Sequence, residues 1–306
     1  MALRDSLANY FDFEEHGTTL RTEVLAGLTT FLTMSYIVVV NPSILVGIPG
    51  EKPGIVVAGY GPGEVQSMLA VVTIVAAATA TLIMALYANR PFGQAPGLGL
   101  NAFFAFTVVG ALGIPWQTAL AAVVVEGIVF IALTAVGARE YIIRAFPEPV
   151  KFAVGTGIGL FLAIIGLQAM GIVVDDPATL VQLGPVATDP VAIVSVVGLL
   201  FTFALYARGI RGSIILGIAV TTALGWVVAN AGLVGGDAAG RLVAGGASAT
   251  YDITPLAGAF VVGLADIEAF TFALVVFTFF FVDFFDTAGT LTGVAQIAGF
   301  LDEKGN

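Results

Sequence analysis

Runs of about 20 consecutive apolar residues recur along the chain, and this is the length that a helix needs to cross the hydrocarbon core of a bilayer. Only 10% of the 306 residues are charged, against roughly a quarter in soluble domains. We therefore predict an all-α polytopic membrane protein. The runs lie at residues 24–46, 65–87, 116–137, 153–174, 190–207, 212–230 and 269–298.

A further apolar segment, residues 91–113, is interrupted by two prolines and several glycines, so hydropathy does not decide whether it crosses. The distribution of basic residues decides whether it crosses. If it crosses, nine lysines and arginines share one side of the membrane, and only Lys52 and Arg241 lie on the other. If it does not, the split is seven to four in the opposite sense. Because basic residues near span ends favour the cytoplasm, we predict eight spans with a broken third span and a cytoplasmic N-terminus. The nine residues are Arg4, Arg21, Arg90, Arg139, Arg144, Lys151, Arg208, Arg211 and Lys304.

The segments outside the spans are short. Residues 1–21 are acidic where a cleavable signal would be basic, so we interpret them as an N-terminal arm. Within this arm, residues 5–15 favour a helix at the membrane surface, with a solvated arm as the alternative. The longest loop, residues 231–268, is rich in glycine and alanine, and its part 255–264 is apolar enough to lie on the membrane.

Composition excludes several functions. There is no cysteine and only one histidine, His16, which leaves no thiol chemistry and no usual zinc site. The net charge of −10 argues against nucleic acid, and no GxxxxGK[ST] loop is present for ATP-driven transport. No nucleophile–base pair or cofactor motif indicates an enzyme. The string GTGIGLF at 155–161 follows no strand, so it predicts close helix packing rather than nucleotide binding.

Two carboxylates, Asp283 and Asp286, lie inside the last apolar run. A carboxylate at the membrane centre costs about 2.5–3.5 kcal/mol on insertion scales, so two in one span need partners or a cavity. Their spacing places them on one helix face together with Thr287 and Thr290. We predict that at least one of them binds substrate or protons, the alternative being a helix cap or a pair inside the bundle.

The broken span carries a second candidate site. Irregular backbone at membrane depth persists only where protein or a water-filled cavity covers it, and transporters use such breaks to hold polar substrates. Asn101 offers hydrogen-bond donors and an acceptor, while Phe103 and Phe104 offer aromatic faces. The alternative is a tight helix crossing in which Asn101 satisfies a neighbouring carbonyl. A lone acid in another span, Glu126, is expected to pair with a neighbouring helix in a structural role.

Four strings together are specific enough for a resemblance. HGTTLRTEVLAGLTTFLTMSYIVVVNPSIL at 16–45, APGLGLNAFFAFTVV at 95–109, GTGIGLF at 155–161 and FVDFFDTAGTLTGVA at 281–295 resemble the AzgA-like branch of the nucleobase:cation symporter (xanthine/uracil permease) family. The resemblance implies transport of purine bases with protons. It also implies fourteen spans in two inverted seven-helix repeats, divided into a core domain and a gate domain.

The family motifs match individual residues here. Asn101 matches the polar position of the third span, Asp283 the acid that faces the base, and Asp286 a second acid with a role in proton coupling or helix geometry. The resemblance implies core-domain helices within 22–150 and span 8 within 269–306, gate-domain helices within 151–230, and an extracellular loop at 231–268. It also suggests a homodimer.

We therefore expect a cell-membrane permease for adenine, guanine or hypoxanthine, with proton symport and no cofactor, metal or nucleic acid. Sodium coupling, a uracil or xanthine transporter of the same fold, and a truncated non-transporting membrane protein remain alternatives. The family's second acidic motif is absent from residues 1–306. We expect these residues to be the first repeat plus one helix of a longer transporter, and not to transport alone.

Overall fold

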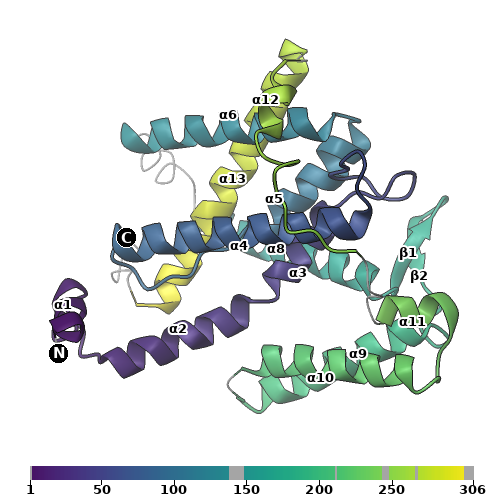
Figure 1. The fold of residues 1–306 in the computed structure, drawn as a ribbon, viewed down its shortest axis with the longest axis horizontal. Coiled ribbons are helices and arrows are strands. Elements are labelled where there is room, and N and C mark those ends of the chain that lie inside the picture. The colour runs from purple at the N-terminus through teal and green to yellow at the C-terminus, as the bar shows by residue number, and fades with distance from the viewer. Residues whose placement is uncertain (1, 138–147, 211, 243–247, 266–267, 300–306) are drawn as a thin grey trace. The chain divides into compact units, whose positions relative to one another are not determined.

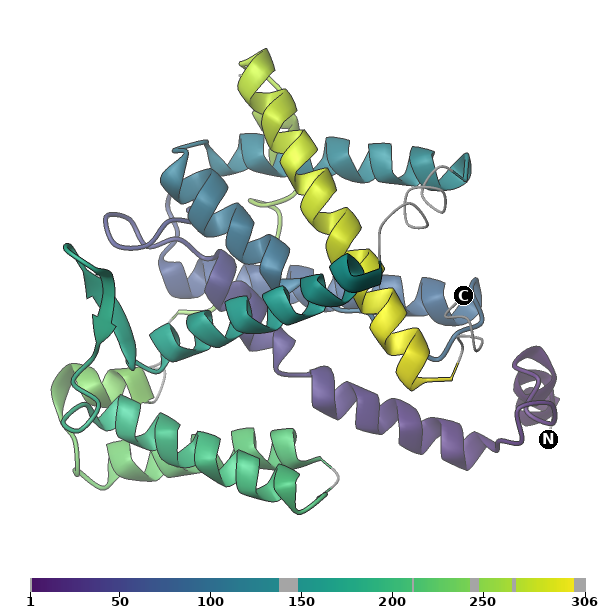
Figure 2. The same cartoon turned by 180° about the vertical axis from the view of Figure 1, so that it is seen from behind.

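The computed structural model describes residues 2–137, 148–210, 212–242, 248–265 and 268–299, which are mostly helical (Figures 1 and 2). Six described helical segments are long and apolar enough to cross a membrane. The chain is therefore a multi-pass membrane protein; the count of eight spans stays a prediction. Arg139, Arg144, Arg211 and Lys304, which carry part of the charge argument, lie outside the described residues. The six segments are Leu20–Leu45, Pro62–Leu86, Trp116–Ala135, Pro190–Ala207, Ser213–Asn230 and Ala269–Ala295.

The chain folds as two compact units, each assembled from three separate stretches of sequence. The first unit comprises Met1–Val40, Val72–Pro96 and Gly166–Ala247, and the second comprises Asn41–Val71, Gly97–Ile165 and Ser248–Asn306. Three described helices begin in one unit and end in the other, α3 (Ile37–Leu45), α4 (Pro62–Leu86) and α8 (Glu148–Ala169).

The first unit contains the N-terminal helices and a helical hairpin. The predicted first span is two helices, because the chain turns at Ser35 and Tyr36 between α2 and α3. The N-terminal arm contains a helix, α1, that ends at Tyr10, whereas the predicted helix reached residue 15; its place at the membrane surface stays a prediction. Tyr10 donates a hydrogen bond to the carbonyl of Leu86, 2.5 Å away. The elements are α1 (Ala2–Tyr10), α2 (Leu20–Met34), β1 (Val173–Asp176), β2 (Leu180–Leu183), α9 (Pro190–Ala207), α10 (Ser213–Asn230) and α11 (Gly236–Leu242).

Helices α9 and α10 pack with their backbones in close contact through two glycine–threonine pairs. A Cβ on Gly198 would lie 2.1 Å from Oγ1 of Thr221, and a Cβ on Gly217 would lie 1.9 Å from Oγ1 of Thr202. Each threonine hydroxyl donates back along its own helix, Thr202 to the carbonyl of Gly198 at 2.8 Å and Thr221 to that of Gly217 at 2.7 Å. Small residues at a helix interface stabilise membrane bundles by van der Waals packing.

The close packing predicted for the glycine string is not found where it was expected. In α8 (Glu148–Ala169), no described heavy atom lies within 4 Å of a Cβ built on Gly157 or Gly159, so that prediction was wrong at these positions. Glycine permits close approach but does not impose it. The interface forms instead where a glycine of one helix faces a threonine of the next.

A β-hairpin follows α8, where the sequence predicted the end of a span. The helix ends at Ala169, and Gly171 reverses the chain with a φ of +72°. Strands β1 and β2 then pair antiparallel, with Val173 opposite Leu183. In their turn, Asp176 accepts hydrogen bonds from the backbone of Ala178 and Thr179, and these bonds hold the pKa of its carboxyl below the usual value.

The predicted loop 231–268 contains two short helices, α11 and α12 (Ala259–Gly263). Helix α11 is tied to the start of α9 by an ion pair of 3.2 Å between Arg241 and Asp189. Asp189 also caps α9 by accepting a hydrogen bond from the backbone N–H of Val191 at 2.9 Å. The N-terminus of α9 is therefore defined both locally and by a distant residue.

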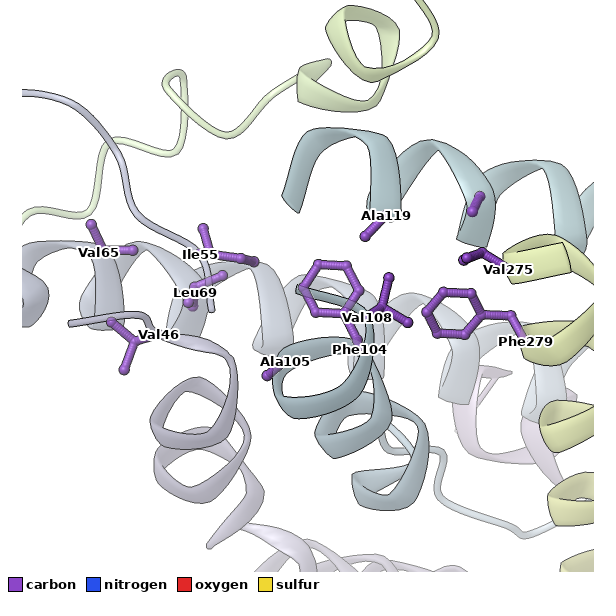
Figure 3. Packing of buried hydrophobic residues seen from close by; sticks show 11 residues of the cluster. Val46, Ile55, Val65, Leu69, Phe104, Ala105, Val108, Ala119, Val275 and Phe279 are labelled. Atoms are coloured by element: carbon purple, nitrogen blue, oxygen red, sulfur yellow. The ribbon is translucent and has the colours of Figure 1, made fainter. Parts of the chain in front are cut away.

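A hydrophobic core lies in the second unit (Figure 3). This core joins α5 (Leu98–Ala102), the π-helix η1 (Phe103–Ala111), α6 (Trp116–Ala135) and α13 (Ala269–Ile297). Helix α12 packs on the first turn of α6, since a Cβ on Gly263 would lie 2.0 Å from the carbonyl oxygen of Gln117. The core contains Val46, Ile55, Val65, Leu69, Phe104, Ala105, Val108, Ala119, Ala122, Val275 and Phe279.

Candidate functional site

The broken segment has the interrupted structure that its prolines and glycines predict. Residues 91–97 have no regular secondary structure, and Gly97 is the N-cap of α5 with extended backbone angles. Helix α5 continues directly into η1, whose wider π-helical winding is frequent at functional sites. The segment thus presents a helix N-terminus, at Gly97, within the second unit.

Asp286 lies against this helix N-terminus. A Cβ on Gly97 would sit 3.0 Å from Oδ2 of Asp286, so glycine leaves room for the carboxylate. The unpaired N–H groups and the dipole at a helix N-terminus favour a negative charge. Asp286 therefore links the last helix, α13, to the break.

Asp283 lies one turn earlier on α13, on the same side as Asp286. It is half-buried, and Thr287 donates a hydrogen bond from Oγ1 to Oδ1 of Asp283 at 3.3 Å. Helix α13 is continuous through both acids, so neither caps a broken half-helix, which was one of the two alternatives for the motif; the other was a pair inside the bundle. Thr290, predicted on the same face, is exposed.

Glu126 of α6 is the partner of Asp283. Its carboxyl group lies close enough to that of Asp283 for the two to interact, in line with the expected pairing with a neighbouring helix. Glu126 is only 6% exposed, and among the described residues its Oε1 atom has no hydrogen-bond partner. The sequence signal for this residue was a single acid in an otherwise apolar span, which did not reveal the partner.

Asn101 is tied to α3 by a side-chain pair. Its Nδ2 donates to Oδ1 of Asn41, a residue of α3 that is 4% exposed. Sequence reasoning missed Asn41, although a polar residue before Pro42 in an apolar run was a usable signal. An asparagine amide carries two N–H groups and one carbonyl oxygen, so this hydrogen bond leaves Asn101 with capacity for a ligand.

The two phenylalanines of the broken segment pack on α13. The ring of Phe103 contacts that of Phe279 edge-on, with 5.2 Å between centroids, and Phe104 lies 6.5 Å from the same ring. Phe104 is 4% exposed and belongs to the hydrophobic core, whereas Phe103 is half-buried (Figure 3). Both rings therefore fix η1 against α13.

The charged side chains of this cluster are all acidic. The carboxyl groups of Glu126 and Asp283 lie near each other, and that of Asp286 lies at the break. Helices α5, η1, α6, α12 and α13 contain no lysine, arginine or histidine. Such a site suits a planar ligand with N–H donors, or a bound proton or cation, and disfavours an anion.

A family profile described as "Permease family", which represents xanthine/uracil permeases, matches residues 21–305. The chain belongs to this family. The match covers nearly all of the sequence, and it confirms the resemblance to the nucleobase:cation symporters.

Three relatives illustrate the similarity. The adenine permease AdeP of Escherichia coli is 39% identical over 302 residues, which cover 98% of this chain and 61% of AdeP. The guanine/hypoxanthine permease PbuG of Bacillus subtilis is 39% identical, over 97% of this chain and 64% of PbuG. A putative permease of Methanocaldococcus jannaschii is 40% identical, over 97% of this chain and 62% of its own. The chain thus spans about three-fifths of the length of these curated relatives, all of which are permeases rather than enzymes.

Proposed function

We propose that this protein is a permease for purine nucleobases such as adenine, guanine or hypoxanthine, driven by proton symport. The observation that carries the proposal is the pairing of the broken segment with the acids of α13, where Gly97 approaches Asp286 and the amide of Asn101 lies in the same unit. The names of AdeP and PbuG support a purine substrate.

In this proposal Asp283 accepts N–H groups of the base, and Asn101 completes recognition of its edge. A purine presents N–H donors and ring-nitrogen acceptors in one plane, which a carboxylate and an amide complement. Phe103 flanks the ring of the base. Phe104, being buried against Phe279, holds the broken segment in position.

Proton coupling involves the acids of α13. Asp283 and Asp286 are the candidates, because a carboxylate in an apolar span binds a proton at lower cost than it bears a charge. Sodium is the other cation that such acids would accept, and the measurement below distinguishes the two.

The proposed topology has eight spans in the cell membrane, the third broken, with the N-terminus in the cytoplasm. Spans 1–4 (within 22–150) and 8 (within 269–306) form the core domain, and spans 5–7 (within 151–230) the gate domain, as parts of an inverted-repeat transporter. Alternating access then follows from movement of one domain against the other around the bound base. A homodimer is part of the same proposal.

Uptake of labelled bases tests this function. The full-length gene product is expressed in cells that lack purine transport, and uptake of hypoxanthine, adenine, guanine and uracil is measured with and without a protonophore. We expect purine uptake that the protonophore abolishes and that removal of sodium does not change. Uptake of uracil alone would show that the substrate is uracil and not a purine. Uptake that depends on sodium would show that sodium is the coupling ion.

The role of Asp283 is tested in the same cells. Asp283→Asn removes the acceptor charge at nearly constant shape and should abolish uptake while the protein still reaches the membrane. The matched control is Asp252→Asn, the same substitution at an exposed loop acid of the second unit, which should leave uptake unchanged. Uptake retained by the Asp283 variant would reject the assigned role.

A further inference from the structure

The buried acid of α6 has no assignment in the function proposed above. Glu126 lies near the middle of a 20-residue helix and is 6% exposed. A carboxylate at that depth requires a partner, because its desolvation in an apolar span is costly. That partner is Asp283 of α13, whose carboxyl group lies close enough to that of Glu126 for the two to interact.

The packing of α6 against α13 fixes this pair. One turn further along α6, the ring of Phe130 lies 6.1 Å from that of Phe280, which is one turn earlier on α13. Helices α6 and α13 pack against each other, and this ring contact lies one turn from Glu126 on α6 and one turn from Asp283 on α13. The acid is thus held by helix packing rather than by a flexible loop.

Two carboxyl groups can hydrogen-bond with each other only if one of them carries a proton, since an ionised carboxylate is purely an acceptor. Two ionised carboxylates in contact also repel strongly in an apolar medium, which is why such pairs share one proton. The Oε1 atom of Glu126 is a further acceptor that is buried and has no hydrogen-bond partner among the described residues.

The elements packed around the pair supply no other neutralising group. The remaining titratable residue of α13 is Asp286, an acid, and α5, η1 and α12 contain no titratable residue. On α6, Glu126 is the sole titratable residue. Within these described elements no side chain offers a positive charge, so a bound proton or another cation is the group that would neutralise the pair.

We propose that Glu126 and Asp283 form a proton-binding pair in which Glu126 carries the transported proton and Asp283 accepts the base. This inference rests on the proposed function and assigns its proton to a residue outside α13. When a base donates an N–H to Asp283, Asp283 must be ionised, so the shared proton resides on Glu126. Base and proton then bind together, and the proton returns to water after the base leaves.

The coupling makes a quantitative prediction. If one proton must bind with each base, the KM for the base rises about tenfold per pH unit once the pH exceeds the range in which the pair holds its proton. Glu126→Gln imitates the shape and neutral charge of the protonated acid, but it has no proton that can be released. This variant should bind and exchange bases with a KM that is nearly independent of pH.

The test compares two transport modes of the full-length protein in proteoliposomes. Wild type should accumulate hypoxanthine when a pH gradient is imposed and should also exchange labelled for unlabelled base. Glu126→Gln should exchange but not accumulate, whereas Glu126→Asp, which keeps an acid, should retain gradient-driven accumulation. The matched control, Glu268→Gln before the first turn of α13, should behave like wild type in both modes.

The outcomes separate this inference from the proposed function. Absence of transport of adenine, guanine and hypoxanthine alike by wild type would reject the function itself. Gradient-driven accumulation by Glu126→Gln, or a pH dependence of its KM equal to that of wild type, would overturn the role of Glu126 alone. If Glu126→Gln does not reach the membrane, the infrared band of a protonated carboxylic acid in wild type at neutral pH decides: its presence supports the pair and its absence overturns it.

Discussion

Truncation of Phe279 should release the broken segment from α13. The side chain is 2% exposed and contacts both Phe103 and Phe104 from the opposite helix. Removing a fully buried phenylalanine ring typically costs about 3–5 kcal/mol, and an edge-on aromatic pair contributes roughly 0.5–1.5 kcal/mol of such a loss. We therefore expect Phe279→Ala to lower the melting temperature in detergent by on the order of 10 °C.

The same substitution should impair transport more than insertion of the protein into the membrane. Because Phe279 holds η1 in place, its loss displaces the segment that carries Asn101, and we expect uptake to fall at least tenfold while the protein still inserts. The matched control is Phe277→Ala on the same helix, where the ring is 60% exposed and its loss should lower the melting temperature by no more than a few degrees.

A double-mutant cycle isolates the contact. Phe279→Ala and Phe103→Ala should be non-additive by about 0.5–1.5 kcal/mol, the value expected for an edge-on pair. Strict additivity, or equal melting temperatures for the Phe279 and Phe277 variants, would refute the claim that this aromatic contact positions the broken segment.

Three further predictions concern the packing of α9 on α10, the cap of α13 and the orientation of Asn101. Gly198→Ala places a methyl group where Oγ1 of Thr221 lies and should destabilise the α9–α10 hairpin by about 1–3 kcal/mol, whereas Gly198→Ala combined with Thr221→Ala should recover part of that loss, as measured by unfolding in detergent. Hydrogen bonds from Thr271, at the start of α13, hold the pKa of Glu268 below its usual value. The ionised Glu268 therefore contributes fully to stability at a pH above the usual pKa, and this contribution is lost as the pH falls through the lowered pKa. Glu268→Gln should make stability less dependent on pH in the acid range. Asn41→Ala should mimic Asn101→Ala in reducing uptake, because it removes the hydrogen bond that orients Asn101, and an unchanged KM for hypoxanthine would contradict this orienting role.

Local sequence signals predicted the helices that have clear ends. The segment 190–207 coincides with α9, because Asp189 caps its start, Pro190 occupies the first turn, and Gly209 turns the chain with a φ of +68° just beyond it. The β-hairpin after α8 was missed, since it depends on hydrogen bonds to Asp176 within a stretch that resembles a loop. Hydropathy is uninformative about such short elements.

The candidate site was predictable by residue type but not by partner. Polar residues in apolar spans, such as Asn101 and Asp283, are visible in the sequence because membrane burial makes them costly. Their partners, Asn41 and Glu126, lie on other helices, and only tertiary packing determines which helices meet. The same limit explains Phe104: an aromatic residue in a broken span suggested contact with a base, whereas the fold buries it in the core.

The most direct test of the central claim is hypoxanthine accumulation by the full-length protein in proteoliposomes under an imposed pH gradient. The account predicts accumulation above the external concentration when the outside is acidic, no accumulation without the gradient, and none for Asp283→Asn. Equal internal and external concentrations for wild type under the gradient would contradict proton-coupled purine transport.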